Sequence, residues 1–94
     1  MGKGYEQELN DLRKKIDEID TQIVELIEKR FEIISKIAII KKKNNLEVFD
    51  KSREESIINK IVEKSKKLPS YVLKDIYEKI FNVSRKFQEE IIKK

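Results

Sequence analysis

The 94-residue sequence contains no cysteine and no histidine. Without cysteine the chain can form neither disulfides nor cysteine-based metal sites, and without histidine it lacks the commonest metal ligand and general base. We therefore expect no metal site. A small domain without such crosslinks must obtain its stability from packing or from oligomerisation.

Long apolar runs are also missing. The longest is residues 37–40 (IAII), far short of the roughly 20 apolar residues that a membrane-spanning helix needs. The N-terminus shows no signal-peptide pattern. We expect no membrane association and a cytoplasmic location.

Charge of one sign is not concentrated anywhere. The 22 basic and 18 acidic residues give a net charge of +4 and are interleaved along the whole chain. This pattern is typical of solvated helix surfaces, so nucleic acid is not an expected partner. Only 38% of the residues are apolar and 43% are charged, which leaves little material for a core of the chain's own.

Glycine and proline are absent between Tyr5 and Leu68, and apolar residues recur in the first part of this stretch at alternating steps of three and four. The heptad pattern predicts a helix over about residues 6–43. Its apolar seam consists of Leu9, Leu12, Ile16, Ile19, Ile23, Leu26, Ile33, Ile37 and Ile40. Such a helix would be roughly 57 Å long, more than the rest of the chain can cover, so we expect it to pack against its own copy in a two-fold dimer.

Asn44 and Asn45 are expected to end this helix, because asparagine tolerates the left-handed conformation. After a short connector, Ser52 and Glu55 fit a capping box that opens a second helix of about residues 52–66. We expect its inner face to comprise Ile57, Ile58, Ile61, Val62 and Ser65.

A third helix is predicted over about residues 71–92, following Pro69 and capped by Ser70. Its apolar face would comprise Leu73, Ile76, Tyr77, Ile80, Phe81, Phe87 and Ile91. The sequence thus predicts an all-α fold with three helices per chain, one of them very long. Residues 1–5 are expected to form a disordered tail, and residues 6–92 a single helical domain.

Arg30 interrupts the apolar seam of the first helix. Because a guanidinium keeps its charge, a buried arginine needs an anion beside it, which could be a glutamate of another helix or a bound ligand. Alternatively, the guanidinium could extend past the seam into water. Lys41 follows eleven residues later, about three helical turns, so both cations project from nearly the same face. Two aligned cations favour an anionic ligand, although a lysine at such a position is more often a solvent-facing charge.

Arg13 precedes Arg30 by seventeen residues, or about 26 Å along a helix, so the two cannot hold one small ligand within a single chain. In an antiparallel pair of long helices, however, Arg13 of one subunit could approach Arg30 and Lys41 of the other. Taken alone, Arg13 also fits a solvent-facing charge.

Polar residues mark the other two helices as well. Ser84 and Gln88 are spaced by four and continue the apolar stripe of the third helix, either as a hydrogen-bonded core pair or as ligand contacts. Asp50, Arg53 and Glu54 lie at the start of the second helix. Charges are common there, and the free N–H groups of a first turn can also bind a ligand.

Together, several short segments resemble the all-helical class of chorismate mutase. They are residues 12–20 (LRKKIDEID), residues 28–30 (EKR), Lys41, residues 50–54 (DKSRE) and residues 84–88 (SRKFQ). Their order and spacing are specific, and the resemblance runs from about Leu9 to Gln88. It favours the ligand-binding interpretation of Arg30 and Lys41.

The resemblance implies an intertwined homodimer with two equivalent pockets, each receiving one arginine from the neighbouring subunit. It implies that such a protein converts chorismate to prephenate, the branch step toward phenylalanine and tyrosine, without a cofactor. Arg13 of the partner chain, Arg30 and Ser84 would help to hold the two carboxylates of the substrate.

By the same resemblance, Lys41 and Gln88 would donate hydrogen bonds to the ether oxygen of chorismate. Asp50, Arg53 and Glu54 would line the side of the ring hydroxyl, with Glu54 accepting its hydrogen bond. A pericyclic rearrangement needs no nucleophile, metal or proton shuttle, so the lack of histidine and cysteine does not exclude it. It needs orientation of the substrate and stabilisation of negative charge on the ether oxygen.

Two features depart from the family pattern. The tract of residues 41–43 leaves the register of the catalytic lysine open, and we choose Lys41 because it shares a face with Arg30. The turn at Asn44 and Asn45 also lacks the glycine often found there.

Three alternatives stay open at the level of sequence. An isochorismate-pyruvate lyase would have a similar fold, although Ser84 and the full 50–54 segment favour the mutase. A non-catalytic helical dimer, or a mutase-like protein that activates a partner enzyme, would also fit.

Overall fold

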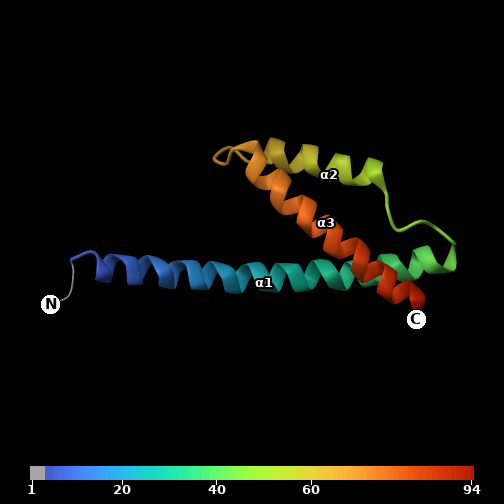
Figure 1. The fold of residues 1–94 in the computed structure, drawn as a ribbon, viewed down its shortest axis with the longest axis horizontal. Helices are drawn as coiled ribbons and strands as arrows, with labels where there is room; N and C mark the ends of the chain where they lie inside the picture. Colours follow the sequence, from blue (N-terminus) through green and yellow to red (C-terminus); the bar gives the residue numbers. More distant parts are fainter. Residues whose placement is uncertain (1–3) are drawn as a thin grey trace. The chain divides into compact units, whose positions relative to one another are not determined.

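The computed structural model describes residues 4–94 and contains three helices, α1 (Glu6–Lys43), α2 (Lys51–Lys64) and α3 (Ser70–Lys93) (Figure 1). Since residues 4–94 contain no strand, the all-α prediction is confirmed. None of the three described helices combines the length and the hydropathy that a membrane crossing requires.

The chain divides into two compact units, Met1–Glu32 and Ile33–Lys94, and each is described by itself. Residues 1–3 of the predicted tail lie outside the described residues. Gly4 and Tyr5 form a turn, and the N–H of Leu9 donates to the Tyr5 carbonyl at 3.0 Å. The disordered tail and the single domain over residues 6–92 therefore stay predictions.

The apolar seam predicted for α1 remains exposed in the single chain. All nine of its residues have between 38% and 63% of their surface accessible. A different face of the same helix is covered, because Ala38 is completely buried while Ile34 and Ser35 are half-buried. One face of α1 thus packs within the chain, whereas the face that carries the seam remains exposed.

The end of α1 agrees with the predicted asparagine stop. Asn45 adopts a left-handed conformation with φ of 53°. Its N–H lies 3.5 Å from the Lys42 carbonyl, and the N–H of Leu46 donates to the Lys41 carbonyl at 2.9 Å. These bonds satisfy carbonyl groups that a helix end leaves unpaired, and asparagine adopts the required conformation at lower cost than most residues.

Both predicted capping residues of the later helices were wrong. The N-cap of α2 is Asp50, whose Oδ1 accepts the N–H of Arg53 at 3.0 Å, and Ser52 already lies within the helix. The Asp50 carboxylate precedes Ser52 in the chain, and the helix that it caps begins at Lys51, one residue before the predicted start. The N-cap of α3 is Pro69, without a side-chain hydrogen bond, and Ser70 is the first helical residue.

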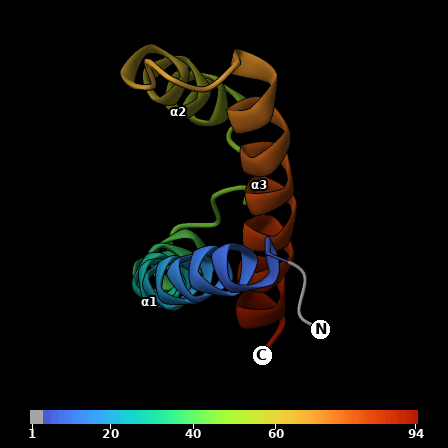
Figure 2. The same ribbon diagram turned by 90° about the vertical axis from the view of Figure 1, so that its left-hand side faces the viewer.

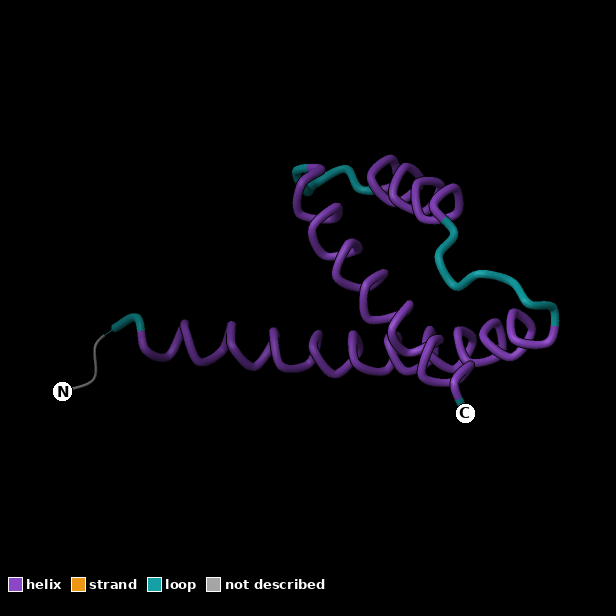
Figure 3. Tube along the Cα trace, turned by 45° about the vertical axis from the view of Figure 1, so that its right-hand side comes forward, coloured by secondary structure: helices purple, strands orange, loops and turns teal. Residues whose placement is uncertain are grey.

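Helices α2 and α3 pack against one another and are joined by the short loop visible in Figure 3. The predicted inner face of α2 is half-buried at each of its five positions. From α3, Phe81 is buried and its ring meets that of Tyr77 edge to face, with 5.9 Å between ring centres. Ile76, predicted on the same face, is instead half exposed, so the covered stripe is narrower than predicted.

The last turns of α3 lie beside the C-terminal part of α1 (Figures 1 and 2). There the Nζ of Lys42 donates to the carbonyl of Lys94 at 3.2 Å. This brings the C-terminal part of α3, which carries the predicted polar pair, near the end of the helix that carries Lys41.

Replacing Asp50 should destabilise the chain through loss of the cap. We expect Asp50→Ala to lower the free energy of unfolding by about 1 kcal/mol, because the N–H of Arg53 loses its acceptor. Asp50→Asn, which keeps a capping oxygen, should change it by only a few tenths of a kcal/mol. Urea unfolding followed by circular dichroism measures both changes. Ser52→Ala is the matched control and should stay within about 0.5 kcal/mol; an equal loss there would restore the predicted capping box.

Candidate active site

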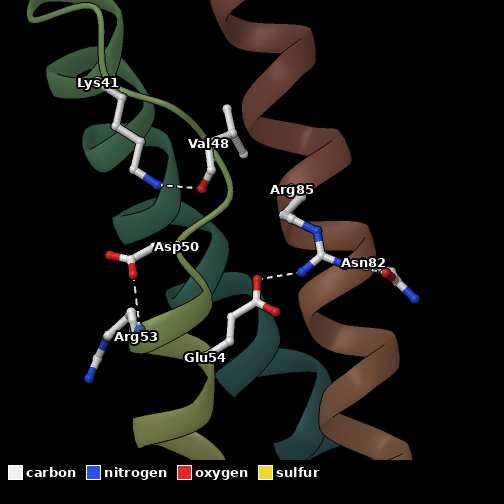
Figure 4. A network of polar contacts seen from close by, with 7 residues as sticks. All are labelled: Lys41, Val48, Asp50, Arg53, Glu54, Asn82 and Arg85. Carbon is white, nitrogen blue, oxygen red and sulfur yellow. Dashed lines mark hydrogen bonds and ion pairs between the residues drawn. The ribbon is translucent and has the colours of Figure 1, made fainter.

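Lys41 is held in place from the connector between α1 and α2. Its side chain is half-buried, and its Nζ donates to the carbonyl of Val48 at 2.7 Å (Figure 4). Lys42 and Lys43 are exposed. An ammonium has three N–H donors, so the bond to Val48 orients the Lys41 head group and leaves hydrogen-bonding capacity for a ligand.

The two predicted arginines of α1 belong to the first unit. Arg30 is half-buried. Arg13 is exposed and lies at a shallow hollow of about 310 Å³ that is also lined by Tyr5, Glu6, Leu9 and Asn10. Its exposure leaves Arg13 accessible to another chain.

The start of α2 presents the three predicted charged residues. The carboxylate of Asp50 is exposed and caps the helix, while Arg53 is also exposed and directs its guanidinium away from Glu54 (Figure 4). Glu54 is half-buried and points toward α3. The three charges therefore lie on one helical turn but point in different directions.

Ser84 and Gln88 are buried on α3, with only 4% and 5% of their surface exposed. Their inward orientation was predicted. The Oε1 of Gln88 has no hydrogen-bond partner among residues 4–94, which argues against a fully satisfied core pair. Leaving a buried acceptor unpaired costs about 1–3 kcal/mol, so this oxygen has the capacity to accept one more hydrogen bond.

Arg85 was missed by the sequence analysis. One of its N–H groups donates to Oε2 of Glu54, and a second donates to Oδ1 of Asn82 (Figure 4). Its Cζ lies 5.0 Å from the centre of the Phe49 ring. The only sequence signal was its place beside Ser84, because Glu54 lies 31 residues away and no local spacing predicts such a contact.

The second unit brings a cation and neutral hydrogen-bonding side chains together. Within the second unit, Lys41 supplies positive charge, whereas Ser84 and Gln88 supply neutral hydrogen-bonding groups from a buried helix face. Within residues 4–94, no group of three or more acidic side chains is arranged to hold a metal ion. Cationic and neutral hydrogen-bond donors of this kind can orient an anion and stabilise negative charge.

Comparison with known protein families identifies the class to which this all-helical chain belongs. The model of the family chorismate mutase type II matches residues 12–89. The chain therefore belongs to this family, which confirms the resemblance inferred from its motifs.

Individual relatives agree with this assignment. The chain is 33% identical over 90 residues to the bifunctional chorismate mutase/prephenate dehydratase of Aquifex aeolicus, covering 90% of this chain and 25% of that protein. It is 38% identical over 55 residues to the chorismate mutase of Methanocaldococcus jannaschii, covering 58% and 56% of the two chains. The match thus spans about a quarter and about half of these relatives.

A solved structure resembles the whole chain. The crystal structure of chorismate mutase from Helicobacter pylori in complex with prephenate superimposes with a TM-score of 0.87 at 34% sequence identity, covering 95% of this chain and 98% of that one. The arrangement of three helices is therefore shared with a protein that binds prephenate.

Proposed function

We propose that the chain is a chorismate mutase, which rearranges chorismate to prephenate without a cofactor. The observation that carries the proposal is the likeness to the Helicobacter pylori enzyme, which was solved with prephenate and is matched over 98% of its length. In this reaction the ether C–O bond breaks while a new C–C bond forms within the same molecule. No atom enters or leaves, so binding, orientation and charge stabilisation are sufficient.

The carboxylates of chorismate are assigned to Arg30, Ser84 and Arg13 of a partner subunit. A guanidinium binds a carboxylate through two parallel N–H donors, which fixes the orientation of the group as well as its position. Holding both carboxylates folds the enolpyruvyl side chain over the ring. This restriction supplies part of the rate enhancement, because the reacting carbons are brought into contact before the reaction.

The ether oxygen is assigned to Lys41 and Gln88, because it gains negative charge as the C–O bond breaks. The proposal is supported by the bond from Lys41 to Val48, which restrains the ammonium, and by the burial of the Gln88 side chain on α3, whose NH₂ group is the donor. Donors that are already oriented stabilise developing charge without reorganisation. The Gln88 amide donates at any ordinary pH, whereas a glutamate there would have to be protonated.

The ring hydroxyl is assigned to the start of α2, with Asp50, Arg53 and Glu54 around it and Glu54 as its acceptor. The half-buried position of Glu54 supports this role, since a partly desolvated carboxylate forms a stronger hydrogen bond.

The functional unit in this proposal is an intertwined homodimer. Its support is the exposed seam of α1, because burying an exposed leucine or isoleucine side chain stabilises an assembly by about 1.5–3 kcal/mol. The partner copy would cover the seam and bring its Arg13 to the pocket. A cytoplasmic location stays a prediction.

The activity itself is tested with two substrates. Purified chain should consume chorismate, seen as loss of its ultraviolet absorbance, and should form prephenate. A bicyclic dicarboxylate that imitates the transition state should inhibit it, because the site is complementary to that geometry. Release of pyruvate from isochorismate, with no prephenate from chorismate, would identify a lyase instead. Activity only in the presence of another enzyme would indicate an activator.

Substitution of the proposed donors should reduce activity without unfolding the protein. We expect Arg30→Ala, Lys41→Ala and Gln88→Leu each to lower kcat/KM by at least about a hundredfold, because each removes a contact to developing or fixed charge. Gln88→Leu should also leave the free energy of unfolding unchanged or raise it, since it removes an unpaired buried group. Steady-state kinetics and urea unfolding measure the two effects.

Lys43→Ala is the matched control for Lys41→Ala, because both residues belong to the same lysine tract and Lys43 is exposed. It should keep kcat/KM within about twofold. Activity in all three donor variants comparable to that of the unsubstituted chain would remove the proposed mechanism.

Sharing of the site between subunits should appear as complementation. Arg13→Ala and Arg30→Ala homodimers should both be nearly inactive. If the two are unfolded together in equal amounts and refolded, half of the dimers are mixed, and each mixed dimer has one intact pocket. The mixture should recover about a quarter of the activity of the unsubstituted protein. Absence of recovery in a mixture shown to contain mixed dimers would mean that Arg13 acts within its own chain, and an active Arg13→Ala homodimer would mean that Arg13 has no role in the site.

A further inference from the structure

Arg85 is a half-buried cation of α3 that has no role in the proposed reaction. Only 27% of its side-chain surface is exposed, and 22% of that of its partner Glu54. A pair so far withdrawn from water differs from the surface pair of Lys51 and Glu55, whose side chains are 78% and 63% exposed. Exposed pairs contribute little, but in a half-buried pair the loss of one partner leaves a poorly solvated charge.

The guanidinium of Arg85 is fixed by groups from three parts of the chain. It donates to Glu54 of α2 and to Asn82 one turn earlier on α3, and it lies over the Phe49 ring in the connector after α1. A planar guanidinium that is held at two N–H groups and one face has little freedom to rotate. Glu54 is therefore bound to a rigid group.

Only one oxygen of Glu54, Oε2, accepts the bond from Arg85. A carboxylate has two oxygens with about four acceptor sites, so Oε1 can still accept a hydrogen bond. The contact thus fixes the carboxylate while leaving it able to bind a hydroxyl group.

We propose that Arg85 is a positioning residue that holds the Glu54 carboxylate, through Asn82 and Phe49, in the orientation that accepts the ring hydroxyl of the substrate. The inference rests on the proposed mutase function. It adds to that function a role for Arg85 in the recognition of substrates whose ring carries a hydroxyl group.

A purely structural ion pair between α2 and α3 would have a different signature. Its loss would lower stability, and any effect on activity would be independent of what occupies position 54. A positioning role acts through the Glu54 carboxylate. Since that hydrogen bond forms with the bound substrate before reaction as well as during it, its weakening should raise KM more than it lowers kcat.

The test is a double-substitution cycle in the full chain with chorismate as substrate. Arg85→Met keeps much of the apolar stem over Phe49 but removes the donors, and we expect KM to rise about tenfold with kcat within about twofold. In a Glu54→Ala background no carboxylate remains to be positioned, so adding Arg85→Met should change KM less than about twofold. Asn82→Ala, which removes one support, should raise KM by about threefold.

Controls separate the possible failures. Lys51→Met removes the exposed pair and should leave KM unchanged, and circular dichroism verifies that each variant is helical. If the unsubstituted chain does not convert chorismate, the proposed function is wrong. If it does, an unchanged KM in Arg85→Met, or the same tenfold rise without Glu54, overturns the positioning role alone.

Discussion

The apolar seam of α1 imposes the constraint on which the rest of the structure depends. A helix of 38 residues whose seam leaves nine leucine and isoleucine side chains in contact with water is not stabilised by its own backbone, because most helical stability in proteins comes from packing of an apolar face. Covering the seam with a second copy would stabilise the helix and, in the same step, deliver Arg13 to the neighbouring pocket. Folding of α1 and assembly of the proposed site then have a common cause.

The connector between α1 and α2 links the end of α1 to the residues of the proposed site. Asn45 ends α1 in a left-handed conformation. The carbonyl of Val48 accepts a hydrogen bond from the Lys41 ammonium, and the ring of Phe49 contacts the Arg85 guanidinium. Asp50 then starts α2 as its N-cap. The short segment of residues 45–50 thus ends one helix, contacts the cations Lys41 and Arg85 and begins the next helix. This explains how a chain with so little buried core holds these charged groups in place.

Most of the fold could be predicted from the sequence because its signals are local. The start and end of α1 follow from the heptad pattern and from Asn45, and the burial of Ser84 and Gln88 follows from their place on the stripe of α3. The caps of α2 and α3 were wrong because Ser52 and Ser70 carry the usual capping side chain, whereas Asp50 caps α2 from two residues earlier and α3 begins at Ser70 directly after Pro69 without a side-chain cap. The contact of Arg85 with Glu54 joins two helices and depends on tertiary packing, so no periodicity could reveal it.

In the proposed site, the long side chains of Lys41 and Glu54 have already lost conformational freedom before a ligand binds. Ordering a lysine or glutamate side chain costs up to about 2 kcal/mol of conformational entropy, and this cost reduces the affinity for a ligand if it is met on binding. The bonds of Lys41 to Val48 and of Glu54 to Arg85 order both groups within the chain itself. The free energy of binding a small dianion could then go toward folding the ligand, which is the step that a rearrangement without a cofactor has to promote.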